Sequence, residues 1–168
     1  IIEHDNLGNT ITINSKIIFK LIDKTKFAIS NEETRYFLNG LYFNITKDQS
    51  NSILTLVGTD GHRLAKFSHN IEDNIDQVSG VIIPKKTIYE LCKLLSEIDK
   101  DVHISISSNK IIFTIDNIIF ISKLIDGSFP DYKRVIPKDN SNILKINREI
   151  LLSAVDRVST IANEKSPV

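Results

Sequence analysis

The order of hydrophobic and polar positions divides the chain into alternating and helical stretches. Val102, Ile104 and Ile106 alternate with polar residues, which is the pattern of a half-buried strand. Short polar turns separate this run from two more, over residues 110–115 and 118–123, and together they predict an antiparallel three-strand meander. The same pattern predicts five further strands, over residues 10–13, 41–45, 53–57, 64–68 and 78–83.

Three other stretches have apolar residues at helical spacing. Asn14 is a suitable N-cap for a helix from residue 15 to about 29, and Pro84 suits the start of a second helix that ends near Ile98. A third helix is predicted after Asn147 and extends to Ala162. We therefore expect both helices and antiparallel sheets in one chain.

A repeat is visible in these patterns. A strand end, a capping residue and an amphipathic helix recur from Ile13, Ile83 and Ile146, and strands follow the first two helices. One helix on one small sheet buries little apolar surface, so two units are expected to share a core in an α+β domain over about residues 11–141. The third copy is expected to open another domain, since its partner strands are missing.

Composition narrows the function only slightly. The 168 residues are 41% hydrophobic, enough for a core, and 21 basic residues balance 21 acidic ones, so bulk charge predicts no polyanion partner. No run of about 18 apolar residues and no signal-peptide pattern is present in the sequence. The single cysteine, Cys92, lies on the apolar side of a predicted helix and indicates a buried thiol in a reducing cytoplasm.

Basic residues gather on the first predicted helix. Lys16, Lys20 and Lys24 project from the face opposite its apolar stripe, and with Lys26 and Asp23 the helix carries a net charge of +3. Such a face is usually only solvated. Because the whole chain is neutral, however, the rest of it must be net acidic.

Residues 58–67 combine a tight turn, two cations and an apolar return strand. Asp60-Gly61 is a hairpin signal, so His62 and Arg63 are expected to leave a turn together. A histidine beside an arginine at a strand start is most often a solvated turn residue. A hydrolase using Asp60 and His62 is the alternative, but no nucleophile or metal-ligand set completes such a site, so we expect no catalytic or metal-binding residues.

Four motifs, in order along the chain, carry a resemblance to a known family. They are RYFLNG at residues 35–40, TDGHRLA at 59–65, FPDYKRVIP at 129–137 and NEK at 163–165. Together they resemble the bacterial DNA polymerase III β subunit, the replicative sliding clamp, over nearly the whole chain. The resemblance implies that residues 1–10 end a first clamp domain, 11–141 form the middle domain and 142–168 begin a third, truncated domain.

The resemblance also implies a fold and a function. In the DNA-clamp fold each domain has two repeated strand-helix-meander units, with helices on the pore side and antiparallel sheets outside, and a homodimer closes a ring around duplex DNA. The expected function is that of a non-catalytic, cytoplasmic processivity factor without cofactors, which binds double-stranded DNA independently of sequence. The DNA-facing residues would be Lys16, Lys20, Lys24, Arg35, Tyr36, Lys85, Lys86 and Lys93.

A second implied site is a groove for short peptides of the replicative polymerase catalytic subunit, the clamp loader, other DNA polymerases and repair proteins. Its wall in this chain would be Leu38, Thr59, Gly61, His62, Arg63, Leu64, Pro130, Arg134 and Val135. Within it, Gly61 would let the peptide backbone approach, and the rest of the groove would lie beyond Val168. A peptide-binding scaffold unrelated to DNA remains the other non-enzymatic hypothesis.

Overall fold

The computed structural model describes residues 10–48, 51–71 and 78–161. The chain divides into two compact units, residues 1–130 and 131–168, and each is described by itself. Within its described residues, the first unit contains two α-helices, two short 3-10 helices and two four-stranded antiparallel sheets. The α+β class expected from the sequence is therefore confirmed.

The first unit consists of two successive repeats of strand, helix and three strands, as the sequence repeat predicted. The first repeat contains β1 (Ile11–Asn14), α1 (Ser15–Asp23), β2 (Gly40–Asp48), β3 (Asn51–Thr59) and β4 (Leu64–Ile71). The second contains β5 (Val78–Pro84), α2 (Lys85–Leu95), β6 (Asp101–Ile106), β7 (Lys110–Ile115) and β8 (Ile118–Lys123). The predicted meander of β6, β7 and β8 is confirmed.

The first strand of each repeat pairs with the other repeat. One sheet has the order β1-β6-β7-β8, and the other has the order β4-β3-β2-β5. In the first sheet Ile11 lies opposite Ile104 and Ile13 opposite Val102, and all four side chains are buried. Because of this exchange, neither repeat can complete its sheet without the other.

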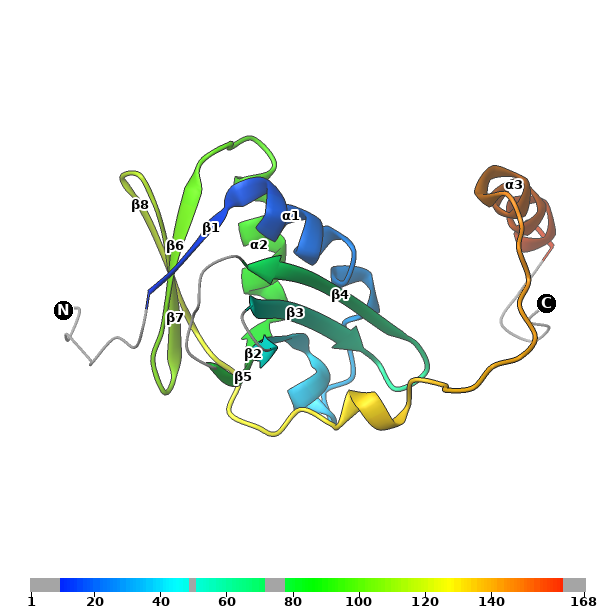
Figure 1. The fold of residues 1–168 in the computed structure, drawn as a ribbon, viewed down its shortest axis with the longest axis horizontal. Coiled ribbons are helices and arrows are strands. Elements are labelled where there is room, and N and C mark those ends of the chain that lie inside the picture. Colours follow the sequence, from blue (N-terminus) through cyan, green and yellow to red (C-terminus); the bar gives the residue numbers. More distant parts are fainter. Residues whose placement is uncertain (1–9, 49–50, 72–77, 162–168) are drawn as a thin grey trace. The chain divides into compact units, whose positions relative to one another are not determined.

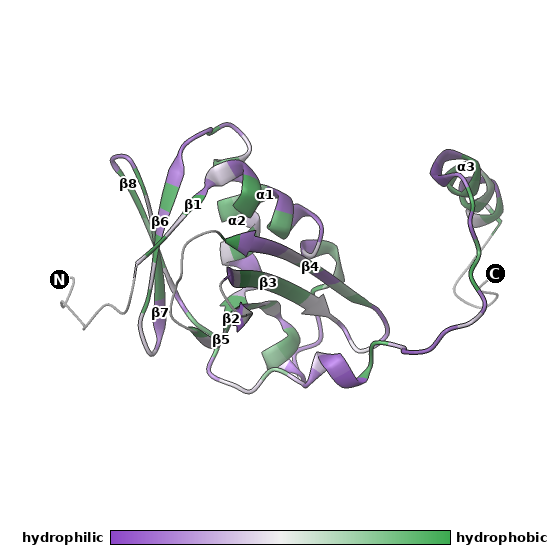
Figure 2. Ribbon diagram, viewed as in Figure 1, coloured by the Kyte–Doolittle hydropathy of each residue, from purple (hydrophilic) through white to green (hydrophobic). Residues whose placement is uncertain are grey.

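Both helices pack on one shared core. They lie side by side (Figure 1), and the core cluster takes residues from both helices and both sheets. Leu21 of α1 and Leu91 of α2 are at most 1% exposed, and full burial of each such side chain contributes about 1.5–3 kcal/mol. β3 contains green segments in Figure 2, and its side chains Leu54, Leu56 and Val57 are buried in the core.

Two helices end earlier than predicted, by about six and about three residues. α1 ends at Asp23 instead of near residue 29, because the buried Thr25 turns its hydroxyl back to the Leu21 carbonyl at 2.7 Å and leaves helical geometry at φ −126°. A short 3-10 helix, Lys26–Ala28, follows. α2 ends at Leu95 instead of near Ile98, and the Ser96 hydroxyl donates to the Lys93 carbonyl at 2.7 Å.

The second unit contains a 3-10 helix, Tyr132–Arg134, and α3 (Arg148–Ser159). Asn147 caps α3 as predicted, accepting the backbone N–H groups of Glu149 and Ile150 at 2.8 and 3.2 Å. α3 ends before Ala162, which lies outside the described residues, as do the NEK motif and residues 1–9. The predicted domain boundaries at residues 10 and 141 remain predictions.

No helix in the described part of the chain is long and apolar enough to cross a membrane.

Candidate functional site

Side-chain hydrogen bonds hold the turn between β3 and β4. Thr59 and Leu64 close the strand pair, and Gly61 between them has a φ of +89°. The Thr59 hydroxyl donates to the Arg63 carbonyl at 2.8 Å and accepts the Gly61 N–H at 3.1 Å. The predicted hairpin is confirmed, and His62 and Arg63 leave its tip exposed to solvent.

The Asp60 carboxylate is committed to this turn. Its Oδ1 accepts the backbone N–H groups of His62 and Arg63, both at 3.0 Å, and its Oδ2 accepts Nε of Arg63 at 3.0 Å. These hydrogen bonds, led by the one from the Arg63 backbone, lower the pKa of Asp60 from 3.8 to about 2. Since both oxygens hold the turn, the carboxylate does not serve as the partner that would orient a catalytic His62 imidazole.

Arg35 forms a hydrogen bond to the backbone of this turn. Its guanidinium forms a two-pronged pair with Glu32, with Nε to Oε2 at 2.8 Å and Nη2 to Oε1 at 2.6 Å. Nη2 also donates to the Asp60 carbonyl at 3.1 Å. The hydrogen bond from Arg35 lowers the pKa of the Glu32 carboxyl. Arg35 is thus engaged with the turn, although the resemblance had suggested that it faces DNA.

Phe27 is a site neighbour that the sequence patterns did not single out. The Arg63 guanidinium lies over its ring, 5.8 Å from the centroid, while the ring remains 55% exposed. Phe27 falls outside the apolar stripe of the first predicted helix. An aromatic residue off that stripe was the only sequence feature that could have indicated an exposed ring near the site. An aromatic face beneath an arginine restricts where that cation points.

The remaining predicted groove residues are distributed over both units. Leu38 ends the 3-10 helix Tyr36–Leu38 and is only 3% exposed, so it offers almost no surface to a peptide in this structure. Pro130 is exposed and follows Phe129, whose ring stacks on Tyr42 at 4.9 Å. In the second unit Arg134 is 85% exposed and paired with Asp131 at 2.9 Å, and Val135 is 68% exposed. The hairpin therefore brings together Thr59, Gly61, His62, Arg63 and Leu64.

The tyrosine between Arg35 and Phe37 is exposed. Tyr36 is 55% exposed, and its ring meets that of Phe37 edge-on at 5.8 Å. It is therefore accessible to a partner, as the DNA-facing prediction requires.

The predicted DNA-facing lysines lie on or beside the two neighbouring helices. Lys16, Lys20, Lys24, Lys86 and Lys93 are exposed, and Lys85 is half-buried. They differ in whether a carboxylate of this chain lies close enough to form an ion pair with them.

Two of these lysines have carboxylate partners. Lys16 pairs with Asp99, and this hydrogen bond lowers the pKa of the Asp99 carboxyl. Lys24 lies 3.8 Å from Asp23. Lys20 and Lys85 instead lie 5.7 Å from the ring centroids of Phe67 and Tyr89, and Lys85 also contacts the Asn31 side chain. Because α1 ends at Asp23, the helix itself holds two lysines and one aspartate, less charge than the predicted +3.

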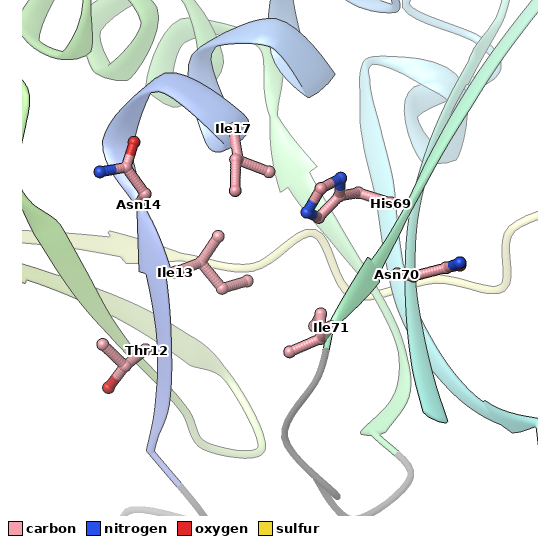
Figure 3. A pocket seen from close by; sticks show the side chains of 7 residues that line it. All are labelled: Thr12, Ile13, Asn14, Ile17, His69, Asn70 and Ile71. Carbon is pink, nitrogen blue, oxygen red and sulfur yellow. The ribbon is translucent and has the colours of Figure 1, made fainter. Parts of the chain in front are cut away.

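A hollow of about 370 Å³ lies between the edge strands β1 and β4. In Figure 3, Ile13 and Ile17 point across it toward His69 and Ile71. It is a seam between the two sheets with a single imidazole in its wall. Among the residues described, no group of three or more His, Cys, Asp or Glu side chains is placed to hold a metal ion.

Comparison with known families assigns the chain. The family model described as "DNA polymerase III beta subunit, central domain" matches residues 12–131. The chain belongs to this family. Membership agrees with the resemblance carried by the RYFLNG, TDGHRLA and FPDYKRVIP motifs.

Relatives of the family support the assignment. The beta sliding clamp of Caulobacter vibrioides is 43% identical over 166 residues, covering 99% of this chain and 45% of that protein. The Escherichia coli beta sliding clamp is 37% identical over 154 residues, covering 92% of this chain and 41% of that protein. The chain therefore spans less than half the length of these two clamps.

Solved structures of the family share the fold. The crystal structure of the Bartonella birtlesii sliding clamp bound to griselimycin superimposes with a TM-score of 0.90 and 50% identity, covering 96% of this chain and 43% of that one. A sliding clamp from Pseudomonas aeruginosa, also bound to griselimycin, gives a TM-score of 0.88 at 36% identity. The order of elements in the chain is therefore that of a continuous segment of a sliding clamp.

Proposed function

We propose that this chain is the central segment of a ring-shaped sliding clamp, the processivity factor of a bacterial replicative DNA polymerase. The observation that carries the proposal is the agreement of sequence and fold with the Bartonella clamp over 96% of the chain. In this proposal residues 11–141 form the middle domain, and residues 142–168 begin a third. The protein is cytoplasmic, non-catalytic and homodimeric.

DNA contact is assigned to the face of α1 and α2. Lys20, Lys86 and Lys93 are exposed cations without a carboxylate in the ion pairs described above, and they lie on neighbouring helices. Phosphate contacts of this kind are independent of sequence and weaken as salt rises. Weak contacts suit a ring that holds DNA by enclosing it and must slide.

Peptide binding is assigned to the surface around the β3–β4 turn. The turn presents Gly61, His62 and Arg63 to solvent on a backbone that side-chain hydrogen bonds hold in place. Leu64 and Pro130 of the first unit add apolar area in this proposal. The second unit contributes Arg134 and Val135, which the resemblance to the family also implies for peptide binding. A short linear motif of a polymerase, clamp loader or repair protein would bind there.

The decisive experiment for DNA uses a complete clamp protein that contains this chain, loaded on circular DNA. We expect retention on the closed circle and rapid loss once the circle is cut, because a ring slides off an end. Equal retention on both forms would refute the clamp function. Absence of any salt-dependent DNA association would favour the peptide scaffold unrelated to DNA.

The peptide site is tested by titrating the same protein with a peptide that begins with Gln and ends in Leu-Phe. Saturable binding that is lost in Leu64→Ala and in Arg134→Ala supports the groove. Lys47→Ala, an exposed position on β2, is the matched surface control and should bind like the wild type. Unchanged binding in both groove variants would reject the assignment.

A further inference from the structure

Glu32 and Arg35, which lie before β2 in the sequence, form a hydrogen-bonded pair that contacts the β3–β4 turn through the Asp60 carbonyl. We propose that Glu32 and Arg35 are a positioning pair, which sets the backbone of the Asp60-Gly61 turn for peptide binding without touching the peptide. The inference rests on the proposed peptide-binding function and deepens it. It also gives Arg35 a role other than contact with DNA.

The geometry of the pair requires an arginine. Glu32 takes two of the guanidinium N–H groups through Nε and Nη2, at 2.8 and 2.6 Å, and Nη2 reaches the Asp60 carbonyl at 3.1 Å. A planar guanidinium can direct the N–H groups of one edge at a carboxylate and another N–H at a carbonyl, whereas a lysine ammonium is a single point of charge. Glu32 thereby fixes the direction in which Arg35 donates to the turn.

The backbone of Glu32 is also held by hydrogen bonds. The Glu32 N–H donates to the Ser30 hydroxyl at 3.1 Å, and the Glu32 carbonyl accepts the Asn39 amide at 3.0 Å. Ser30 is 2% exposed, and its N–H donates to the Leu38 carbonyl at 3.1 Å. Hydrogen bonds therefore hold the loop that carries the pair at both of its ends. The Arg35 guanidinium consequently donates to the turn from a fixed position.

The turn is shaped to receive the guanidinium. A Cβ atom on Gly61 would lie 2.5 Å from Nη1 of Arg35 and 3.4 Å from its Cζ. The guanidinium therefore occupies the space beside Gly61 where any other residue would place its side chain. The absence of a side chain at Gly61 serves Arg35 here, in addition to the approach of a peptide.

Charge also favours a positioning role. The Glu32 carboxylate offsets the Arg35 cation at hydrogen-bond distance, so little net charge remains for a DNA phosphate. Removing Glu32 would release the cation while leaving all the proposed groove residues intact. The two roles for Arg35 therefore predict opposite effects of the same substitution.

The experiment compares Glu32→Ala, Arg35→Lys and Glu33→Ala in the complete clamp protein, using the Gln-to-Leu-Phe peptide. Glu32→Ala and Arg35→Lys should each weaken binding by about fivefold to tenfold, which is the usual net effect of losing one intramolecular hydrogen bond between partly exposed groups. Their double variant should be little worse than either alone, since they break one unit. Glu33→Ala removes the same charge from the neighbouring exposed position and should bind like the wild type.

A second readout reports the turn itself. Hydrogen exchange of the segment around Gly61 should become faster in Glu32→Ala and Arg35→Lys and remain unchanged in Glu33→Ala. Normal affinity in Glu32→Ala together with lost binding in Leu64→Ala would overturn the positioning pair and leave the groove standing. Loss of affinity in Arg35→Lys alone, or tighter retention of Glu32→Ala on DNA, would also overturn it. Failure of the wild type to bind the peptide would instead refute the proposed function.

Discussion

Gly61 is required for two physical reasons that mutation can separate. Its φ of +89° lies where a residue with a side chain is strained, at a cost of about 1–2 kcal/mol. Its missing Cβ leaves room for the Arg35 guanidinium, whose Nη1 would be 2.5 Å from that atom. In Gly61→Ala the guanidinium must move and lose its hydrogen bond to Asp60, worth about 1 kcal/mol for a side chain partly exposed to water.

The expected total loss for Gly61→Ala is about 2–3 kcal/mol in the free energy of unfolding. Urea unfolding of the 168-residue chain, followed by circular dichroism, measures it. With a denaturant slope of about 2 kcal/mol per molar, the midpoint should fall by about 1–1.5 M. Gly127→Ala is the control, because Gly127 is exposed and has no positive φ. Its added Cβ would lie 3.2 Å from the Phe37 Cβ, so a small steric cost of up to about 1 kcal/mol is expected without backbone strain.

The two causes separate in an Arg35→Ala background. There the clash is absent, so Gly61→Ala should cost only the backbone strain, and the two substitutions should couple by about 1 kcal/mol. Strictly additive costs would show that Arg35 does not fill the space beside Gly61. A loss no larger than that of Gly127→Ala would refute both parts of the reasoning.

Three further predictions concern stability. Because the folded pKa of Asp60 is about 2, below its ordinary 3.8, its contribution is present above about pH 4 and is lost as the pH falls toward 2; Asp60→Asn should flatten that acid limb in a series of urea midpoints, and an unchanged limb would contradict the assignment. Leu91→Ala should cost about 2–5 kcal/mol by leaving a cavity in the shared core, whereas the exposed Lys93→Ala should change the urea midpoint little. Asn14→Ala should lose about 1 kcal/mol by removing the cap that accepts the Lys16 N–H at 2.9 Å, and Asn14→Ser, which caps without adding a charge beside Asp99, should retain it if capping is the cause.

Local chemistry made much of the fold predictable. The alternation of Val102, Ile104 and Ile106 identified β6, because a half-buried strand needs one apolar face. Asn14 and Asn147 marked the starts of α1 and α3, since their side chains accept the N–H groups that a helix start leaves free. Helix ends were less predictable: Thr25 fits a helical stripe, and only its buried hydrogen bond to Leu21 shows that the helix has already stopped.

The candidate site was predictable only where its residues are neighbours in the sequence. The residues from Thr59 to Leu64 form the turn through short-range hydrogen bonds, so the sequence indicated both the turn and the residues at its tip. The sequence pattern gave no sign that Arg35 and Phe27 contact the turn, because each reaches it across more than twenty residues of chain. Such contacts depend on how the intervening strands pair.

By itself, the sequence determined the kinds of element, their repeat along the chain and the β3–β4 turn, because each depends on side chains a few residues apart. Tertiary structure alone decided that β1 joins the second repeat and β5 the first, and that Glu32 and Arg35 support the turn. Hydrophobic periodicity tells each strand which face to bury but not which edge to join. That choice is made when the two repeats close one core, and it brings the distant loop of Glu32 and Arg35 against the turn.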